Sequence, residues 1–298
     1  MRELRGLVFL ARLTCRRQAF SRKTWVALTL VALSCLAAGA WGWRQRASGE
    51  WRRGPPAPAW VQRWRPDRVV VDGLYLALKV PDAVNAADRD YHPNFPLRFA
   101  ELFGMQLHLS FVLPMLCLLF AAGAWADERD ERTLALLLAR PLTPWKMHLA
   151  KAAGIAPVVL AAGVGGFGLV CLAAGPAGRT NWVAFAPAVA WTTLGYSSLF
   201  LGFGAALRRP LVFGAAYAGF FEFLVGNFPG TIKRLSIAFY GKCLMYDAGA
   251  PLGFQPANRA MFLPVTASAA RWTLALAALA FLALGAWLFH RREHHDLS

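Results

Sequence analysis

The most densely charged stretch of the chain lies between two segments that are apolar enough to cross a membrane. A leucine-rich run from Thr133 to Leu138 follows it and predicts a short helix with one apolar side, which Arg140-Pro141 ends. We interpret the stretch as a rigid cytoplasmic helix, braced against the bilayer at both ends, that presents charge to a cytosolic partner. An ordinary solvated loop is the alternative, but it would not need a leucine-rich helix between charge and proline. The charged residues are Asp127, Glu128, Arg129, Asp130, Glu131 and Arg132.

Glu222 is the second chemical candidate, because it lies near the middle of an apolar segment, residues 211–228. An ionisable group at that depth is costly unless it is paired or hydrated, so it marks a functional site by default. The alternative is a structural anchor, hydrogen-bonded to a neighbouring helix or to broken backbone near Gly226-Asn227. The sequence leaves both interpretations open.

Other motifs give weaker evidence for a functional site. The run from Gly163 to Gly168 matches GxGxxG, but it lies within an apolar segment, where small residues let helices approach closely. His290 and His294 have the i,i+4 spacing of metal ligands and His295 follows, yet no cysteine or carboxylate constellation supports them, so we expect a solvated tail and no metal site. There is no GxxxxGK[ST] motif and no paired catalytic residues. We therefore predict no catalytic residue and no cofactor on this chain, so that ATP, if used, is bound by another chain.

Composition sets the class of protein. Of 298 residues, 57% are hydrophobic and only 16% are charged, whereas soluble domains are about 25% charged. The apolar excess is concentrated in runs near the roughly 20 residues that span a bilayer. The net charge of +16 would suggest nucleic acid in a soluble protein, but here Arg and Lys flank the apolar runs and face anionic lipid, so we expect no nucleic-acid partner.

We predict an all-α integral membrane protein with six transmembrane helices. A basic amphipathic helix over residues 1–24 precedes them on the cytoplasmic surface; a secretory signal is the alternative, but its basic region would be too long. An outer loop, residues 44–104, contains a possible hairpin around Asp72-Gly73. A cytoplasmic coupling loop, residues 127–151, separates spans one and two from spans three and four, and a re-entrant or interfacial outer segment occupies residues 229–270. The expected spans are residues 25–43, 105–126, 152–174, 182–207, 211–228 and 271–290.

Charge distribution predicts the orientation. The outer loop is at the length, about 60 residues, beyond which loop charge stops controlling topology. With that loop set aside, most Lys and Arg lie on the side of the amino terminus. We therefore predict a multi-pass protein of the inner membrane of a bacterial-type cell. Both termini, including the tail at residues 291–298, and the charged stretch are expected in the cytoplasm.

In the charged stretch and the residues that follow it, the sequence resembles the permease subunits of ABC-2 type transporters. Their first cytoplasmic loop begins with acidic and basic residues and continues through Thr-Leu, a leucine-rich turn and Arg-Pro to a Lys that enters the next span, here Lys151. Arg132 stands where the family often has Gly. Phe221-Glu222 followed by Pro229-Gly230 resembles the family's pattern around span five. The likeness extends over nearly the whole chain.

The resemblance implies three things about function. A separate ABC ATPase subunit would bind ATP and magnesium, and the charged stretch with Thr133, Arg140 and Pro141 would form the coupling contact to it. Two membrane subunits, identical or homologous, would form the pathway, and the family favours export. The rivals are an ion- or proton-coupled secondary carrier that uses Glu222 and a membrane-embedded enzyme. The sequence does not identify the substrate.

Overall fold

The computed structural model describes residues 2–47, 98–131, 143–226, 231–250, 254, 256 and 262–292. Every element in these ranges is a helix. In chain order they are α1 (Arg2–Ala19), α2 (Arg22–Ala47), η1 (Ala100–Val112), α7 (Leu113–Cys117), η2 (Leu118–Ala122), α8 (Gly123–Asp130), α10 (Pro144–Ala174), α11 (Pro176–Ala206), α12 (Pro210–Ala216), η3 (Tyr217–Val225), η4 (Ile232–Leu235), α13 (Ile237–Gly249) and α15 (Ala267–Arg292). The expected hairpin around Asp72-Gly73 lies outside the described residues.

Five helices of the described ranges are long and apolar enough to cross a membrane. They correspond to five of the six expected spans, and they confirm an all-helical, multi-pass membrane protein. The element from η1 to α8 is the most buried of them, with 83% of its most apolar window inside the protein, against 28% for α2 and 22% for α15. The protein is therefore built around its second span. The five candidate spans are Arg22–Arg44, Ala100–Asp130, Pro144–Ala174, Asn181–Ala206 and Ala267–Arg291.

The helices begin and end where backbone chemistry requires it. Thr143 is extended and Pro144 takes the first position of α10, where the missing N–H costs nothing. Gly175 has a φ of 83°, which only glycine adopts readily, and it separates α10 from α11. Pro210 opens α12 in the same way as Pro144 opens α10. The amino-terminal amphipathic helix that the sequence predicts is observed as α1.

The fifth expected span, residues 211–228, is an unbroken helical run from Pro210 to Val225 that changes from α-helix to π-helix at Tyr217. It consists of α12, with 7 residues, and η3, with 9 residues. After Val225 and Gly226 the described chain resumes with η4, and α13 then packs against α11, α15 and η1. Because α12 contacts η2 and α8 whereas α13 contacts η1, the two helices lie at opposite levels of the bundle. Within the outer segment expected over residues 229–270, the described chain forms η4 and α13, and the number of crossings stays a prediction.

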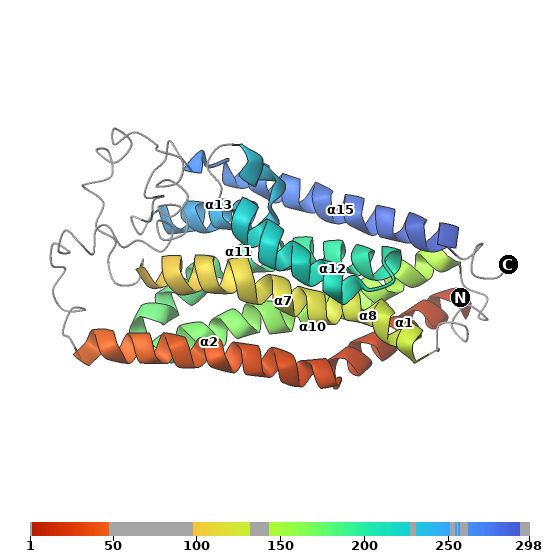
Figure 1. The fold of residues 1–298 in the computed structure, drawn as a ribbon, viewed down its shortest axis with the longest axis horizontal. Helices are drawn as coiled ribbons and strands as arrows, with labels where there is room; N and C mark the ends of the chain where they lie inside the picture. The colour runs from red at the N-terminus through yellow and green to blue at the C-terminus, as the bar shows by residue number, and fades with distance from the viewer. Residues whose placement is uncertain are drawn as a thin grey trace.

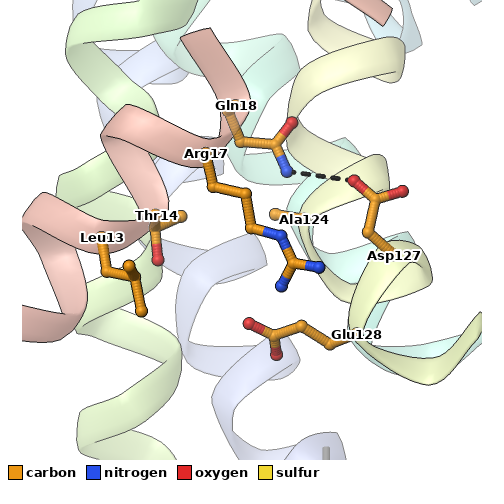
Figure 2. Close-up of a pocket in the computed structure, with 7 residues that line it drawn as sticks. All are labelled: Leu13, Thr14, Arg17, Gln18, Ala124, Asp127 and Glu128. Carbon is orange, nitrogen blue, oxygen red and sulfur yellow. Dashed lines mark hydrogen bonds between the residues drawn. The ribbon is translucent and has the colours of Figure 1, made fainter. Parts of the chain in front are cut away.

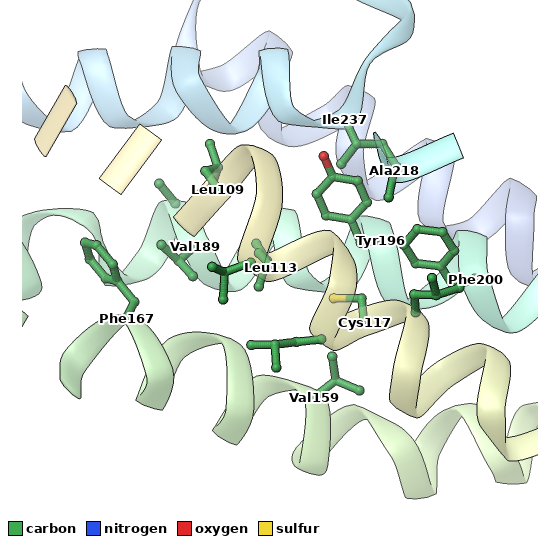
Figure 3. Close-up of a cluster of buried hydrophobic side chains, with 14 of the residues drawn as sticks. Leu109, Leu113, Cys117, Val159, Phe167, Val189, Tyr196, Phe200, Ala218 and Ile237 are labelled. Carbon is green, nitrogen blue, oxygen red and sulfur yellow. The ribbon is translucent and has the colours of Figure 1, made fainter. Parts of the chain in front are cut away.

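The core lies between η1–η2, α10 and α11, as Figure 3 shows for Leu113, Val159 and Phe200. Glycines of the GxGxxG match help to close it. A Cβ on Gly163 would lie 2.7 Å from Leu113 Cδ1, and one on Gly168 would lie 3.1 Å from the Trp182 ring. The prediction that this motif serves helix packing is confirmed for Gly163 and Gly168, whereas Gly165 has nothing within 4 Å of its Cβ position.

One end of the bundle collects α1, α8, the start of α10, the end of α11, the start of α12 and the end of α15 (Figure 1). We call it the charged end, because the charged stretch that follows Ala126 lies here. The start of η1 and the end of α13 lie at the opposite end (Figure 1).

Candidate functional site at the charged end and at Glu222

The charged stretch is in part a continuation of the second span. Asp127 to Asp130 form the last turn of α8, and the helix ends at Glu131. On the other side, Pro144 to Lys151 are the first turns of α10. The loop expected over residues 127–151 is thus shorter than predicted, because membrane helices extend into it from both sides. Arg132, Thr133, Arg140 and Pro141 lie outside the described residues.

Two acidic residues of the stretch bind α1 and the start of α2. Asp127 forms an ion pair with Lys23 and also accepts a hydrogen bond of 3.2 Å from Gln18 Nε2. Glu131 forms an ion pair with Arg17. The side chains of Arg17 and Glu131 remain 34% and 55% exposed, so water screens this pair. The amphipathic helix is therefore attached to the end of the second span by charge.

Glu128 is turned inward. It is 6% exposed and forms an ion pair with Lys151, which is 1% exposed. Lys151 Nζ also donates to the Ala124 carbonyl at 2.9 Å and lies 4.0 Å from the centre of the Trp125 ring. The Glu128 carboxylate therefore faces the interior of the bundle, and the expectation that the charged stretch meets a partner stays a prediction.

Arg129 reaches a third helix. Its guanidinium donates to the carbonyl oxygens of Gly204 and Leu207, at the end of α11. The last carbonyls of a helix have no partner within that helix, and a cation is favoured there by the helix dipole. The charged stretch therefore connects α8 to α1, α2, α10 and α11.

Apolar contacts complete the attachment of α1. Leu10 packs with Met147 and Ala150 of α10, and Leu7 covers them. A Cβ on Gly154 would overlap the carbonyl oxygen of Ala11, so the two backbones touch at that point. This side of α1 is fixed to the protein.

Figure 2 shows a small cavity where α1 meets α8, with Arg17 reaching between Asp127 and Glu128. Its volume is about 20 Å³, which is enough for one water molecule. Cationic and anionic side chains line it together, so it offers no selective ion site.

The charged end thus has an inward part and an outward part. Asp127, Glu128 and Arg129 hold helices together, whereas Asp130 and Glu131 are exposed. The described helices on both sides of residues 132–142 are held in place: the Glu128–Lys151 ion pair joins the end of α8 to the start of α10, and α1 contacts both.

Glu222 is fully buried and its carboxylate accepts four hydrogen bonds. Oε1 accepts from Tyr217 Oη at 2.7 Å and from the Ile237 amide at 3.0 Å. Oε2 accepts from Ser236 Oγ at 2.6 Å and from the Ala238 amide at 3.1 Å. Since the first amides of a helix lack partners within the helix and attract negative charge, Glu222 caps α13. The structure favours the anchor interpretation of this residue.

Sequence reasoning missed the partners of both sites. Lys23 and Arg17 read only as membrane-flanking charge, and nothing in the sequence joins them to residues more than a hundred positions away. Ser236 carried a local signal, because a serine before an apolar helical run is a typical N-cap, and its Oγ does accept from the Phe239 amide at 3.3 Å.

No group of three or more potential metal ligands occurs among the described residues. His290 lies in the last turn of α15, while His294 and His295 lie outside the described ranges.

Comparison with known proteins identifies the family. The family model of the ABC-2 family transporter proteins matches residues 21–294. No curated protein matches the chain. Because the family model covers nearly the whole sequence, the chain belongs to the ABC-2 family of transporter membrane proteins.

Proposed function

We propose that this ABC-2 family member is the membrane-spanning permease subunit of an exporter, driven by a separate ATPase that binds at the charged end. Family membership supports a permease subunit of an ABC transporter. The finer assignment rests on the charged end, where Asp130 and Glu131 lead into a loop whose two ends are fixed to the bundle.

The contact would work as a lever. The partner ATPase, which holds ATP and magnesium, presses on residues 130–142 when its subunits close. Because Asp127, Glu128 and Arg129 tie α8 to α1, α2, α10 and α11, the movement of the loop becomes a movement of helices. Access then switches by a shift between two states of the bundle.

Two further parts of the proposal concern assembly and orientation. The weakly buried spans α2 and α15 leave apolar faces for lipid and for a second permease subunit, identical or homologous. The bundle spans the inner membrane of a bacterial-type cell. Its charged end faces the cytoplasm, because the basic residues of α1 lie at this end.

The geometry of Glu222 argues against a proton- or ion-coupled carrier. All four acceptor positions of its carboxylate are occupied by protein donors, and an occupied carboxylate has no free position for a coupling ion. An ATP-driven transporter needs no titrating carboxylate in the membrane.

The test is copurification and charge reversal. The full-length chain should bring down a P-loop ATPase, and inverted vesicles holding the complex should transport only with ATP. Asp130→Lys with Glu131→Lys should reduce ATP-dependent transport by about 10-fold while the amount of folded subunit stays constant. Glu128→Lys is unsuitable, because it would place two ammonium groups together in a buried site.

Asp247→Lys is the matched control, since Asp247 is an exposed acidic residue of α13 at the opposite end. It should leave coupling unchanged. Full ATPase association and full transport in the Asp130/Glu131 double variant would refute the coupling assignment.

A further inference from the structure

The two sides of α1 have different surroundings. The inner side is covered by the bundle, and Leu10, Thr14 and Gln18 on it are buried. On the other side Phe9 and Leu13 are 52% and 48% exposed. Large apolar side chains that lie together at a surface mark a contact with another molecule or with the membrane.

Arginines lie among these apolar side chains. Arg5, Arg12 and Arg16 are exposed, and each is three or four residues from Phe9 or Leu13, so the five side chains share one face of the helix. We call these five residues the outer face of α1. A helix at a membrane surface has this mixture, because its apolar groups enter the boundary of the acyl chains while the guanidinium groups stay among the headgroups.

The charges of the outer face differ from the other cations nearby. Arg17 and Lys23 form ion pairs with Glu131 and Asp127 of the charged end. Within the part of the chain that the structure describes, the three arginines of the outer face form no ion pair. Their charge is therefore directed to a partner outside this chain, and that partner must be anionic.

Exposed tryptophans indicate where the membrane surface lies. Trp25, Trp145 and Trp287 are exposed near the charged-end termini of α2, α10 and α15. The Arg291 guanidinium lies 4.2 Å from the centre of the Trp287 ring. Tryptophan is enriched at the membrane–water interface. Because α1 bends away from the start of α2 at this end (Figure 1), it begins at the level of the headgroups.

We propose that the outer face of α1 is a binding surface for anionic phospholipids, with its arginines on the phosphates and Phe9 and Leu13 at the boundary of the acyl chains. An acidic protein could bind the arginines, but it would have to reach them at the level where the tryptophans place the headgroups. Lipid then holds α1 from the side opposite to the Gln18–Asp127 hydrogen bond. This inference goes beyond the proposed ATP-driven function; only the assignment to the cytoplasmic leaflet rests on it.

A fluorophore on α1 tests what surrounds the outer face. The five cysteines of the full-length chain are replaced by Ser or Ala, and Leu13→Cys is labelled with bimane. The protein is reconstituted into phosphatidylcholine vesicles with a minor fraction of phosphatidylglycerol. Quenching by phosphatidylglycerol that is brominated near the headgroup is compared with quenching by equally brominated phosphatidylcholine at the same mole fraction. Leu276→Cys, at an exposed position within α15, is the reference for bulk lipid.

We expect both lipids to quench bimane at Leu13→Cys, and phosphatidylglycerol to quench it more strongly, whereas the two lipids should quench equally at Leu276→Cys. Arg12→Gln with Arg16→Gln should lower the local enrichment of phosphatidylglycerol by about 5-fold for each arginine. Arg12→Lys with Arg16→Lys is the matched control. It should keep the preference, because attraction to an anionic leaflet depends on charge rather than on the bidentate geometry of arginine.

Four results would overturn the proposal. Equal quenching by the two lipids at Leu13→Cys would remove the selectivity for anionic lipid, and a preference that survives in the glutamine double variant would exclude the arginines. Quenching by acrylamide but by neither lipid would place the outer face in water. Loss of lipid quenching when the ATPase is added would assign the face to a protein contact.

Phe9→Cys repeats the measurement at a second exposed position and serves if the labelled Leu13→Cys chain gives a low yield. The same preference for phosphatidylglycerol is expected there, and its absence would contradict the proposal. Failure of the proposed function appears differently, as transport that does not require ATP, and it leaves the lipid measurement unaffected.

Discussion

Carboxylates fasten helices at two places in this protein, in opposite ways. At the charged end Asp127, Glu128 and Glu131 meet the cations Lys23, Lys151 and Arg17. In the interior, the Glu222 hydrogen bonds come from neutral donors, two hydroxyls and two amides. The first arrangement depends on opposite formal charges, and the second depends on donors held in fixed positions around one carboxylate.

The difference shows what each site can tolerate. An ion pair can be exchanged for another pair of opposite charge or for two apolar residues of similar volume. A carboxylate that caps a helix accepts hydrogen bonds from backbone amides. No second substitution can alter those amides to compensate for a change of the carboxylate. Mutations should therefore be rescued at the charged end but not at Glu222.

The largest effect is expected for Glu222→Leu. It leaves Tyr217, Ser236 and the first amides of α13 without an acceptor in an apolar interior, at about 1–3 kcal/mol for each unsatisfied group. We expect loss of most folded protein, measured by detergent-solubilised yield and by the SDS-unfolding midpoint. Glu222→Gln keeps the shape and one acceptor oxygen, and it should retain much of the transport; equal damage from both substitutions would contradict the capping role.

The second largest effect is expected for Lys151→Met, because it removes the buried ammonium that pairs with Glu128, and breaking a buried ion pair costs up to about 3–5 kcal/mol. The double variant Lys151→Met with Glu128→Leu removes both charges and should recover most of the unfolding free energy. The SDS-unfolding midpoint of single and double variants measures this. If the double variant is no more stable than Lys151→Met alone, the comparison between the two sites fails.

Gly154→Ala tests the apolar attachment of α1. The new Cβ would meet the Ala11 carbonyl, and overpacking of this kind costs about 1–3 kcal/mol. Gly165→Ala, on the same helix with nothing within 4 Å of its Cβ, is the control and should be neutral or stabilising. Proteolysis between α1 and α2, at the turn around Phe20, should accelerate only in Gly154→Ala.

The sequence predicted what depends on local pattern. Long apolar runs predicted five segments that coincide with helices long and apolar enough to cross a membrane, and the basic amphipathic pattern predicted α1. It also identified Glu222, because a carboxylate in an apolar run is conspicuous wherever it pairs. It failed where the outcome depends on which distant groups meet. The pattern of Asp127 to Arg132 reads as a solvated surface, and only the approach of Lys151 and Lys23 turns two of its carboxylates inward.

The same limit applies to residues 211–228. Their hydropathy suits a single crossing, but the described helix ends at Val225, and Glu222 within it accepts hydrogen bonds from the first amides of another helix. Hydropathy averages over a window and does not record which backbone amides a carboxylate will find.

The smallest effect on stability is expected for the Arg17–Glu131 pair. Both side chains are well exposed, and an ion pair of this kind contributes about 0–1 kcal/mol. Glu131→Gln should therefore shift the unfolding midpoint only slightly, and raising the ionic strength should abolish even that difference, since salt screens exposed charges. The buried Glu128–Lys151 pair should respond much less to salt. If Glu131→Gln is as destabilising as Lys151→Met, or if its effect is equally insensitive to salt, the outward and inward parts of the charged end are one site. The coupling assignment, which depends on separating the two parts, would then be wrong.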